Sequence, residues 1–570
     1  MKVDKRWTIK TANEEIVNEL NKSLHIHPAI CKLLDVRGIK DFENAKLFFR
    51  PELSHLHDPF LMKGMKKSVD RISEAIEWHE RIMVYGDYDV DGTTAVSLVY
   101  SFLKEHYSGE LTYYIPHRYK EGYGVSKQGI DHAHDNGYSL IITLDCGIKS
   151  ADIIAYAQSL GIDVIVCDHH LPDKNIPNAY AILNPKQPDC KYPYKELSGC
   201  GIGFKLITAL AIHWKLSLEK SVYKYLDLVV TSIAADIVPM DGENRILAFY
   251  GIKKLNESPC LSIATLKELG GVKKPLTVSD LVFVIGPRVN AAGRMDDARK
   301  AVEFFIETDP QRIVTLAAVL HSDNFDRKEV DKSITEEALS IINDDTMLQK
   351  RKSTVLYRPH WHKGVVGIVA SRLIDHYYRP TIVLTSANGK ATGSARSVSG
   401  FNIYEAIHEC RDLLENYGGH FYAAGMTLGE NRVEEFIERF EYVVSHSITE
   451  DQQVPEIEID AEIPLTMVKQ PFYNIIKQFE PFGPANMKPV FLTKHLFDYQ
   501  GNSTVVKDMH IRLVAFQENG AVIEGIGFNM ADKYDIVCNG PFDMVYNIDE
   551  NEYNGNTKLQ VRVIDIRKSI

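Results

Sequence analysis

Three aspartates occupy alternate positions in the stretch VYGDYDVDGTTA, at Asp87, Asp89 and Asp91, directly after an apolar run. Carboxylates this close together repel one another unless a cation lies among them, so the spacing predicts a metal site. A calcium loop of the EF-hand type would need a bidentate Glu at loop position 12, which is Leu98 when the count starts at Asp87. The residues before the stretch are also typical of a strand rather than a helix. The EF-hand interpretation is therefore excluded.

Acids and histidines also follow other apolar segments. The candidate ligands share this position, and they are Asp87, Asp89, Asp145, Asp168, His169, His170 and Asp236. A single acid at a strand end is more often the N-cap of the next helix, and His169-His170 alone could be two hydrogen-bonded polar residues, so the prediction depends on the convergence of four endings. Carboxylate oxygens and imidazole nitrogens without cysteine suit Mn²⁺ or Mg²⁺. Their number exceeds the need of one ion, which favours a two-metal centre that activates water for phosphoryl hydrolysis.

These side chains need a scaffold that brings separate segments together. From residue 80 onward, apolar β-type runs alternate with helical stretches such as 93–107 and 151–161, and the runs are 81–87, 111–116, 139–145, 163–170 and 179–185. Nearly continuous apolar strands that alternate with helices predict a parallel sheet covered on both faces. Such sheets carry their sites at the carboxyl ends of the strands. A further apolar stretch, residues 225–236, ends at Asp236 and is expected to reach the same edge.

The composition is that of an ordinary water-soluble protein of three or four domains. The 570 residues are 45% hydrophobic and 25% charged, and no apolar stretch approaches the roughly 18 to 20 residues of a membrane span. The first 20 residues lack the apolar core of a signal peptide. Eight scattered cysteines without a C-x-x-C pair argue against a disulfide framework or a zinc ribbon. We therefore expect a cytoplasmic protein.

The charge is unevenly distributed along the chain. The net charge is −12, so bulk electrostatics does not draw the whole molecule to nucleic acid. Residues 350–400, however, contain nine Lys or Arg and one Asp, a balance of +8, whereas residues 451–570 contain 11 basic and 17 acidic residues, a balance of −6. The positive segment predicts a contact with a polyanion. The alternative is a solvated charged face, the usual form of a charge run.

Changes in the pattern of expected helices and strands along the chain predict five parts. Short helices form a lead-in, the parallel-sheet domain follows, and a helical region joins it to a second α/β segment with two glycine-bearing loops, TGSARS and YGGHFYAAGM. The last 120 residues hold several short strands with polar turns, which predict a small closed barrel. The expected bounds are 1–75, 76–296, 297–350, 351–447 and 448–570.

Four short motifs, GDYDVDG, LDCGI, CDHH and ADIVP, occur in this order and resemble those of the DHH phosphoesterase superfamily, and YGGHFYAAGM resembles its accessory DHHA1 domain. Longer strings narrow the resemblance, and these are IPHRYKEGYG, LSGCGIGFKL, GPRVNAAGRM, WHKGVVGIVASRL, GSARS and EPFGPANMKPVF. Together they are similar to the RecJ family of single-strand-specific 5′→3′ exodeoxyribonucleases over about residues 20–500. The resemblance implies an α/β fold: a DHH domain with a mostly parallel sheet, a linking helix, a second α/β DHHA1 domain and a C-terminal OB-like β-barrel.

The resemblance also implies roles for individual residues. The metal ligands would be Asp87, Asp89, Asp145, His169 and Asp236, with Asp145 as the best candidate to bridge two ions. His170 would bind the second ion or the scissile phosphate, Asp168 would orient a histidine, and Asp91 would do the same or cap the following helix. The implied catalytic set is Asp89, Asp145, Asp168, His169 and His170. Many relatives carry His where this chain has Tyr85, so one coordination position would pass to water or to His170.

Substrate contacts follow from the same resemblance. The expected contacts are Arg118, Arg288, Arg294, Ser394, Arg396 and His420. A guanidinium matches phosphate oxygens with two parallel hydrogen bonds. Ser394 and the backbone amides of TGSARS would seat a terminal 5′-phosphate, and His420 would face the active cleft from the second α/β domain. For each arginine taken alone, a surface ion pair is the alternative.

The function implied by the resemblance is hydrolysis of single-stranded DNA from its 5′ end to 5′-mononucleotides by two-metal-ion catalysis, in DNA repair and recombination. The expected cofactors are Mn²⁺ or Mg²⁺, two ions in all. A helicase and a single-strand-binding protein are the expected partners of a chain that we expect to be a monomer without membrane contact. Two alternatives stay open: a DHH-family phosphodiesterase of short oligonucleotides or cyclic dinucleotides, which the acidic tail favours, and a non-catalytic nucleic-acid-binding protein with the same fold.

Overall fold

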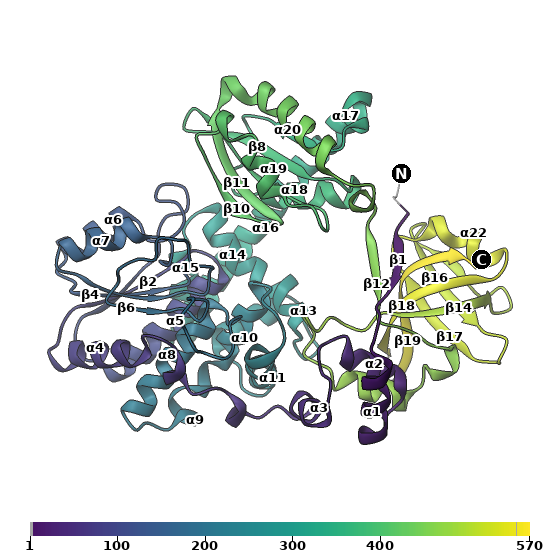
Figure 1. Ribbon diagram of the computed structural model, residues 1–570, viewed down its shortest axis with the longest axis horizontal. Helices are drawn as coiled ribbons and strands as arrows, with labels where there is room; N and C mark the ends of the chain where they lie inside the picture. The colour runs from purple at the N-terminus through teal and green to yellow at the C-terminus, as the bar shows by residue number, and fades with distance from the viewer. Residues whose placement is uncertain (1–3, 554–555, 570) are drawn as a thin grey trace.

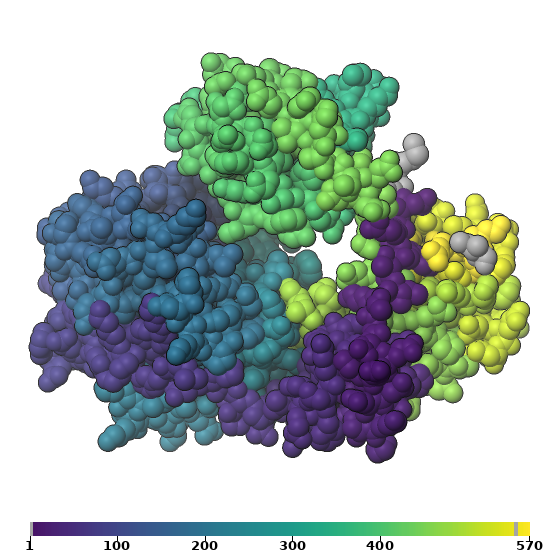
Figure 2. All heavy atoms as spheres, in the orientation of Figure 1, coloured from purple at the N-terminus to yellow at the C-terminus, as the bar shows by residue number. Residues whose placement is uncertain are grey.

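The protein is organised as three lobes around an opening. The structure is a computed structural model, and it describes residues 4–553 and 556–569. A first α/β lobe, a second α/β lobe and a barrel lobe surround the opening, which the space-filling view shows (Figures 1 and 2). Helix α16 (Pro310–Asp344) leads from the first lobe to the second. Within the described ranges, no helix combines the length and the apolar character needed to cross a membrane.

The first lobe is built on a five-stranded parallel sheet in the order β3-β2-β4-β5-β6. The predicted β-type runs all form strands, which are β2 (Ile82–Gly86), β3 (Leu111–Tyr114), β4 (Leu140–Leu144), β5 (Asp163–Cys167) and β6 (Ala181–Leu183). Their residues alternate between two cores, with Val84 and Ile142 in one and Met83 and Ile141 in the other. Both faces of the sheet are therefore covered, as the continuous apolar runs predict.

Helices form the two covering layers. On one face lie α6 (Lys127–Asp135) and α7 (Ala151–Ser159), and on the other α5 (Val90–His106), α8 (Gly199–His213) and α10 (Leu226–Ala235) pack against one another (Figure 1). The remaining helices of this lobe are α4 (Met65–Glu77), α9 (Leu218–Ser221), α11 (Gly242–Glu257), α12 (Leu261–Leu269), α13 (Val278–Asp280), α14 (Gly286–Met295) and α15 (Arg299–Ile306). Because the helices cover the two faces, the carboxyl edge of the sheet is left to the segments that carry the candidate ligands.

The apolar stretch 225–236 is a helix and not a strand that ends at the sheet edge. Every residue from Leu226 to Ala234 in α10 is buried. A helix that is buried on all sides gives a continuous apolar run without a 3.6-residue period, which is why the pattern resembled a buried strand. Asp236 is therefore the C-cap residue of α10.

The second lobe contains a five-stranded sheet in the order β10-β11-β9-β8-β7. Its elements are β7 (Thr354–Tyr357), β8 (Thr381–Ala387), β9 (Lys390–Arg396), β10 (Asn416–His420), β11 (Ala423–Gly429), α17 (Thr346–Lys350), α18 (Val366–His376), α19 (Ile403–His408) and α20 (Val433–Ser447). The predicted loops TGSARS and YGGHFYAAGM lie instead in β9 and in the β10–β11 hairpin. Close packing explains the glycine of the first segment, because a Cβ on Gly393 would come within 2.1 Å of the Val383 carbonyl oxygen.

The barrel lobe holds a seven-stranded sheet in the order β13-β14-β18-β19-β17-β16-β15, and an extra pairing of β14 with β16 closes it. Its elements are β13 (Ala461–Glu462), β14 (Phe491–Asp498), β15 (Thr504–Val506), β16 (His510–Phe516), β17 (Val522–Gly527), β18 (Phe542–Tyr553), β19 (Asn556–Lys568), α21 (Gln470–Lys477) and α22 (Tyr534–Cys538). The small closed barrel predicted from the strand-rich tail is thus present.

The first and the last described segments of the chain both lie at the barrel lobe (Figure 1). Strand β1 (Arg6–Ile9) pairs in parallel with β12 (Glu456–Ile459). Helices from the first 50 residues share one hydrophobic core with the barrel, and they are α1 (Glu14–Leu24), α2 (Pro28–Asp35) and α3 (Phe42–Phe49). Helix α4 belongs instead to a core of the first lobe. The predicted lead-in is therefore divided between two lobes.

Arg245 of α11 joins the first lobe to the barrel lobe. Its buried guanidinium donates hydrogen bonds to the carbonyl oxygens of Phe479 (2.7 Å), Phe48 (3.2 Å) and Gln478 (3.2 Å). The guanidinium also lies 3.8 Å from the ring centroid of Phe48. Because burial disfavours the charged form, the pKa of Arg245 falls to about 9. One side chain thus connects segments from three parts of the chain.

Candidate metal centre and anion pocket

Acidic and imidazole side chains gather at the carboxyl edge of the first-lobe sheet. Strands β2, β4 and β5 run parallel and in register, so the residues that follow them are neighbours: Asp87 after β2, Asp145 after β4, and His169 after β5. Asp89 is the N-cap of α5, and its carboxylate accepts a hydrogen bond from the Gly92 amide (3.0 Å). The edge predicted from the strand endings is therefore the place where these groups meet.

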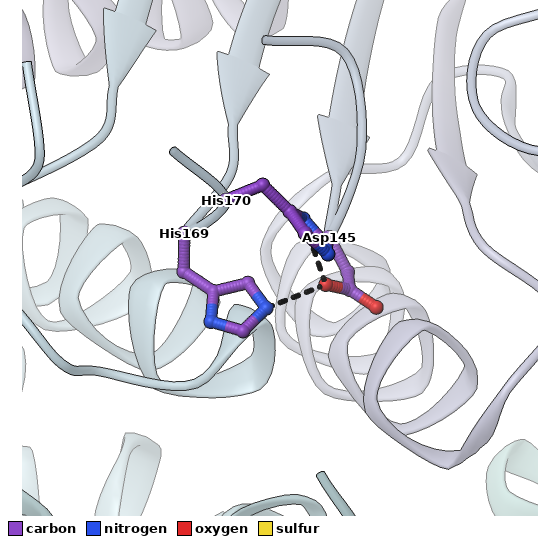
Figure 3. Close-up of side chains that lie close together, drawn as sticks. All are labelled: Asp145, His169 and His170. Atoms are coloured by element: carbon purple, nitrogen blue, oxygen red, sulfur yellow. Dashed lines mark ion pairs between the residues drawn. The ribbon is translucent and has the colours of Figure 1, made fainter. Parts of the chain in front are cut away.

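Asp145 lies between the two histidines that follow β5 (Figure 3). Its Oδ1 is 3.1 Å from Nε2 of His169 and 3.9 Å from Nδ1 of His170. The backbone of Asp145 has a φ of 60°, in the left-handed region that side-chain-bearing residues seldom adopt. Such strain costs about 1–3 kcal/mol and is typical of functional sites, where the surrounding structure holds it.

Three groups of side chains place one ligand atom each within 4.8 Å of the others. The groups are Asp87–Asp89–Asp145, Asp145–His169–His170 and Asp91–His169–Asp236. Asp145 and His169 each belong to two groups, so two cations bound here would share ligands. The predicted ligands therefore all lie in one cluster, including Asp236, which reaches it from the end of α10.

Three buried atoms make no hydrogen bond among the described residues, namely Asp87 Oδ1, Asp145 Oδ1 and His169 Nε2, although the last two lie 3.1 Å apart. Burial together with neighbouring carboxylates raises the pKa of Asp87 and of Asp145 well above the ordinary value, and burial lowers the pKa of His169. Buried polar atoms without partners are costly. A divalent cation would remove this cost at all three atoms, so the residues fit Mn²⁺ or Mg²⁺.

Asp168 holds His170 in place. Its Oδ1 accepts a hydrogen bond from the His170 amide (3.0 Å) and lies 2.7 Å from Nδ1 of the same residue, while its Oδ2 accepts from the Ile148 amide (2.9 Å). Burial alone would raise the pKa of Asp168, but the hydrogen bond and charge of His170 lower it to about 2. Tyr123 adds a third constraint, since its hydroxyl lies 3.1 Å from Nε2 of His170. Asp168 thus contacts both the backbone and the ring of His170, which are the contacts that an orienting group would make.

Asp91 caps a helix other than its own. Its carboxylate accepts hydrogen bonds from the Gly199 amide (2.6 Å) and the Cys200 amide (2.7 Å) at the start of α8, and from the Ser232 hydroxyl (2.7 Å). The expectation that Asp91 caps the following helix, α5, is wrong. Tyr85 points away from the cluster, since its hydroxyl donates to the Gly124 carbonyl oxygen (3.2 Å), so it offers no ligand.

A cavity of about 500 Å³ lies between the first and second lobes. Its polar lining is cationic and includes Arg118, Arg294, Lys363, Ser394 and Arg396. No carboxylate of the described chain forms an ion pair with any of these four cations. Burial, assisted by the charges of Arg118 and Arg396, lowers the pKa of Arg294 to about 10. Cations gathered without a counter-ion, beside the N-terminal residues of α18, predict an anion site.

The pocket and the acidic cluster share one wall. Tyr88 and Tyr123 both line the pocket. Tyr88 lies between Asp87 and Asp89 in the chain, and the Tyr123 hydroxyl contacts His170. An anion held in the pocket is therefore next to the metal centre, with these two aromatic rings between them.

Comparison with known proteins assigns the three lobes. Sequence models described as DHH family, N-terminal domain, as DHHA1 domain and as RecJ OB domain match residues 81–233, 350–446 and 459–565. The chain is 36% identical to the single-stranded-DNA-specific exonuclease RecJ of Bacillus subtilis, over 98% of this chain and 70% of that protein. The chain belongs to the RecJ family. RecJ of Escherichia coli is 31% identical over 98% of this chain and 99% of that protein.

Solved RecJ structures have the same architecture. RecJ of Thermus thermophilus in complex with Mn²⁺ matches with a TM-score of 0.84 at 26% identity, over 99% of this chain and 80% of that one. The same protein in complex with Mg²⁺ gives a TM-score of 0.79 at 25% identity, over 99% of this chain and 79% of that one. The predicted fold and the predicted choice of Mn²⁺ or Mg²⁺ are therefore confirmed for this RecJ-family chain.

Two predicted substrate contacts of this RecJ-family chain lie elsewhere or act differently. Arg288 is buried at the contact of α14 with α16, where it donates to the Val284 carbonyl oxygen (2.5 Å) and to Nδ1 of His321 (3.3 Å). It does not line the pocket. The amides of TGSARS cannot seat a phosphate, because β9 pairs with β8 on one side and β11 on the other. Thr392, Gly393, Ser394 and Arg396 of this segment line the cavity, and of these Arg396 brings the charge.

The positive charge of residues 350–400 is offset in part by acids from outside the segment. Four of its nine cations form ion pairs, namely Arg351 with Glu438, Arg358 with Glu337, Arg372 with Asp331 and Lys390 with Glu415. Lys363 and Arg396 are the two cations of this segment that line the pocket. Of the predicted polyanion contact of residues 350–400, two side chains thus lie at the pocket, Lys363 and Arg396.

Three residues at the site were not identified from the sequence. Tyr123 and Lys363 lie in the quoted strings IPHRYKEGYG and WHKGVVGIVASRL, but nothing in their spacing indicates that they meet at a pocket. Asn184 is fully buried, and its side-chain amide donates to the His170 carbonyl oxygen (2.9 Å). The position of Asn184 directly after the apolar run of β6 was the one signal in the sequence that could have identified it.

Proposed function

We propose that this RecJ-family protein is a single-stranded-DNA-specific exonuclease that hydrolyses phosphodiester bonds from the 5′ end. The observation that carries the proposal is the wall shared by the acidic cluster and the cationic pocket, formed by Tyr88 and Tyr123. A terminal phosphate in the pocket would place the next phosphodiester beside the ligands. The names of the relatives from Bacillus subtilis and Escherichia coli specify single-stranded DNA as their substrate.

The residues proposed to hold the metal are Asp87, Asp89, Asp145, His169 and Asp236. Asp145 belongs to two overlapping ligand groups, which would suit the binding of two ions. When bound, such ions would supply an activated water and charge stabilisation for in-line displacement at phosphorus. His170, whose Nδ1 is engaged by Asp168, is positioned to direct Nε2 toward a phosphate oxygen.

Polarity would follow from the pocket. Arg118, Arg294 and Arg396 offer several charge-assisted hydrogen bonds to a doubly charged phosphate monoester, which DNA carries at its end and not within the strand. Water attack at the first phosphodiester, with departure of the 3′-oxygen of the first nucleotide, releases a 5′-mononucleotide. The shortened strand then carries a new 5′-phosphate. Each cycle thus regenerates the group that the pocket binds.

Single-strand preference would have a steric origin. A pocket of about 500 Å³ enclosed by two lobes accepts one terminal nucleotide, so a duplex end would have to separate before its 5′-phosphate reached the arginines. A place in DNA repair and recombination, a helicase and a single-strand-binding protein as partners, a monomeric state and a cytoplasmic location are further proposals that rest on the family.

The test is digestion of 20-nucleotide strands labelled at the 5′ or the 3′ end, with Mn²⁺ or Mg²⁺. We expect the 5′ label to appear at once in a mononucleotide and the 3′ label to stay on progressively shorter strands. A duplex of the same sequence should be spared, and Asp145→Asn should be inactive while folded. Loss of the 3′ label first would overturn the proposed polarity, and preference for a dinucleotide over the 20-mer would favour a small-substrate phosphodiesterase.

A further inference from the structure

Strand β10 leads from the anion pocket past the metal centre. It is the edge strand of the second-lobe sheet, and Tyr417 and Gly418 within it line the pocket. Its last residue, His420, has a pKa lowered by burial and by positive charges of the first lobe, which belong to Lys149, His170 and Lys186. Tyr123, which lines the same pocket as Tyr417 and Gly418, contacts His170 through its hydroxyl, so β10 lies on the His170 side of the cluster.

Two aromatic side chains follow immediately at the tip of the β10–β11 hairpin. The side chains of Phe421 and Tyr422 are exposed, with 41% and 53% of their surfaces accessible, and their ring centroids are 4.7 Å apart. The backbone beneath them is fixed, because the Phe421 carbonyl oxygen accepts from the Ile403 amide (3.0 Å) and the Tyr422 carbonyl oxygen accepts from the Ser397 amide (3.0 Å). A rigid backbone thus presents two rings that take no part in the described hydrophobic core of this lobe.

Lys186 of the first lobe is a cation whose charge acts on His420 at the end of β10. The Lys186 amide donates to Oδ1 of Asn184 (2.8 Å), and the Asn184 side chain in turn donates to the His170 carbonyl oxygen (2.9 Å). The Lys186 ammonium lies 2.9 Å from Glu196, a partner whose side chain is 45% exposed. An exposed partner of this kind is readily replaced by a phosphate, so the surroundings of the hairpin tip suit a polyanion.

From this geometry we infer that Phe421 and Tyr422 are a stacking platform for the nucleobases of the strand that enters the metal centre, on the 3′ side of the scissile bond. The inference rests on the proposed function and deepens it. The occupant is single-stranded nucleic acid because the platform continues the line from the terminal-phosphate pocket through the cluster. Base stacking on aromatic rings tolerates any sequence and requires an unpaired base. The platform would therefore add to single-strand preference without reading the bases.

The test asks whether removing a single base and removing the two rings slow the reaction through the same contact. Strands of 20 nucleotides with a 5′-phosphate carry one abasic position at nucleotide 2, 3, 4 or 5, and release of the first nucleotide is followed under single-turnover conditions. With the wild-type protein, one or two of these positions should slow release about tenfold, the size of one stacking contact. The double variant Phe421→Ala/Tyr422→Ala should be slowed about tenfold on the intact strand and should gain no further penalty at those positions. Tyr442→Ala, which removes an exposed ring from α20 of the same lobe, is the matched control and should behave as wild type.

The inference would be overturned if an abasic position slowed release equally in the wild type and the double variant. It would also be overturned if the double variant were slowed by the same factor on every strand, including the abasic ones. A second readout needs no hydrolysis: 2-aminopurine at the sensitive position should be quenched on binding to the metal-free wild type and not to the double variant. If the wild type released no nucleotide from the 5′ end, the proposed function would fail, while the fluorescence would still decide whether the rings stack on bases.

Discussion

Replacing Arg396 with alanine isolates the contribution of the pocket to the choice of substrate. The guanidinium donates to the Ser394 hydroxyl (2.7 Å) and to the Ala395 carbonyl oxygen (2.8 Å), and it has no carboxylate partner among the described residues. Hydrogen bonds to charged groups contribute about 1.5–3 kcal/mol each. Loss of one such contact to a terminal phosphate should lower kcat/KM roughly 10- to 150-fold, since about 1.4 kcal/mol corresponds to a factor of ten. Arg118 and Arg294 remain, so some preference for the phosphate should persist.

The measurement compares kcat/KM on 20-mers that carry either a 5′-phosphate or a 5′-hydroxyl. The loss in Arg396→Ala should fall almost entirely on the phosphorylated strand. Arg358→Ala is the matched control, because this arginine belongs to the same basic segment but pairs with Glu337 away from the pocket. An equal loss on both strands would refute the assignment of the pocket to the terminal phosphate, and so would an equal loss in the control variant.

Three further variants test other features. In the metal-free protein the raised pKa of Asp145 means that the folded state binds a proton more tightly than the unfolded state, so the stability that this proton contributes is lost as the pH rises above the ordinary Asp value of about 3.9. Asp145→Asn should therefore raise the melting temperature at pH 8 in EDTA and shrink the gain in melting temperature on adding Mn²⁺. A lower melting temperature of the variant in EDTA would contradict this. Arg245→Ala leaves several buried carbonyl oxygens without donors and should weaken the joint between the first lobe and the barrel lobe by about 3 kcal/mol, measured by urea denaturation and by faster limited proteolysis near residue 480. Arg288→Ala should lower thermal stability yet leave the preference for a 5′-phosphate unchanged, and a lost preference would return Arg288 to the substrate site.

The clustering of the candidate ligands could be predicted from the sequence because most of them stand in a strong local context. Asp87, Asp145 and His169 follow strands that are buried on both faces, and parallel strands end at a common edge. Asp236 reaches the cluster as predicted, but from the end of a helix and not from a strand-like run. The helix was not recognised because a fully buried helix has no polar stripe to reveal its period. Of the two roles expected for Asp91, the capping of α5 was wrong, because the helix that it caps, α8, lies far along the chain.

The anion pocket could be predicted only in part. Its cations come from both lobes, and no local pattern encodes how one lobe docks on the other. Arg288 and Arg294 lie on one short helix, α14, yet they face different neighbours, and six residues correspond to well over one turn. The glycine-bearing segment TGSARS predicts a loop because glycine is uncommon in strands, whereas the close approach of Val383 requires glycine at position 393.

The shared core of the first 50 residues and the barrel has a consequence for how the chain matures. Helices α1 to α3 are synthesised long before the apolar partners that cover them, which begin at Ala461. The apolar faces of these helices stay exposed through most of synthesis. They should therefore bind chaperones and be the first place where a nascent chain would aggregate. Fusions or deletions at the amino terminus should consequently damage the barrel, far downstream, before they affect the hydrolytic centre.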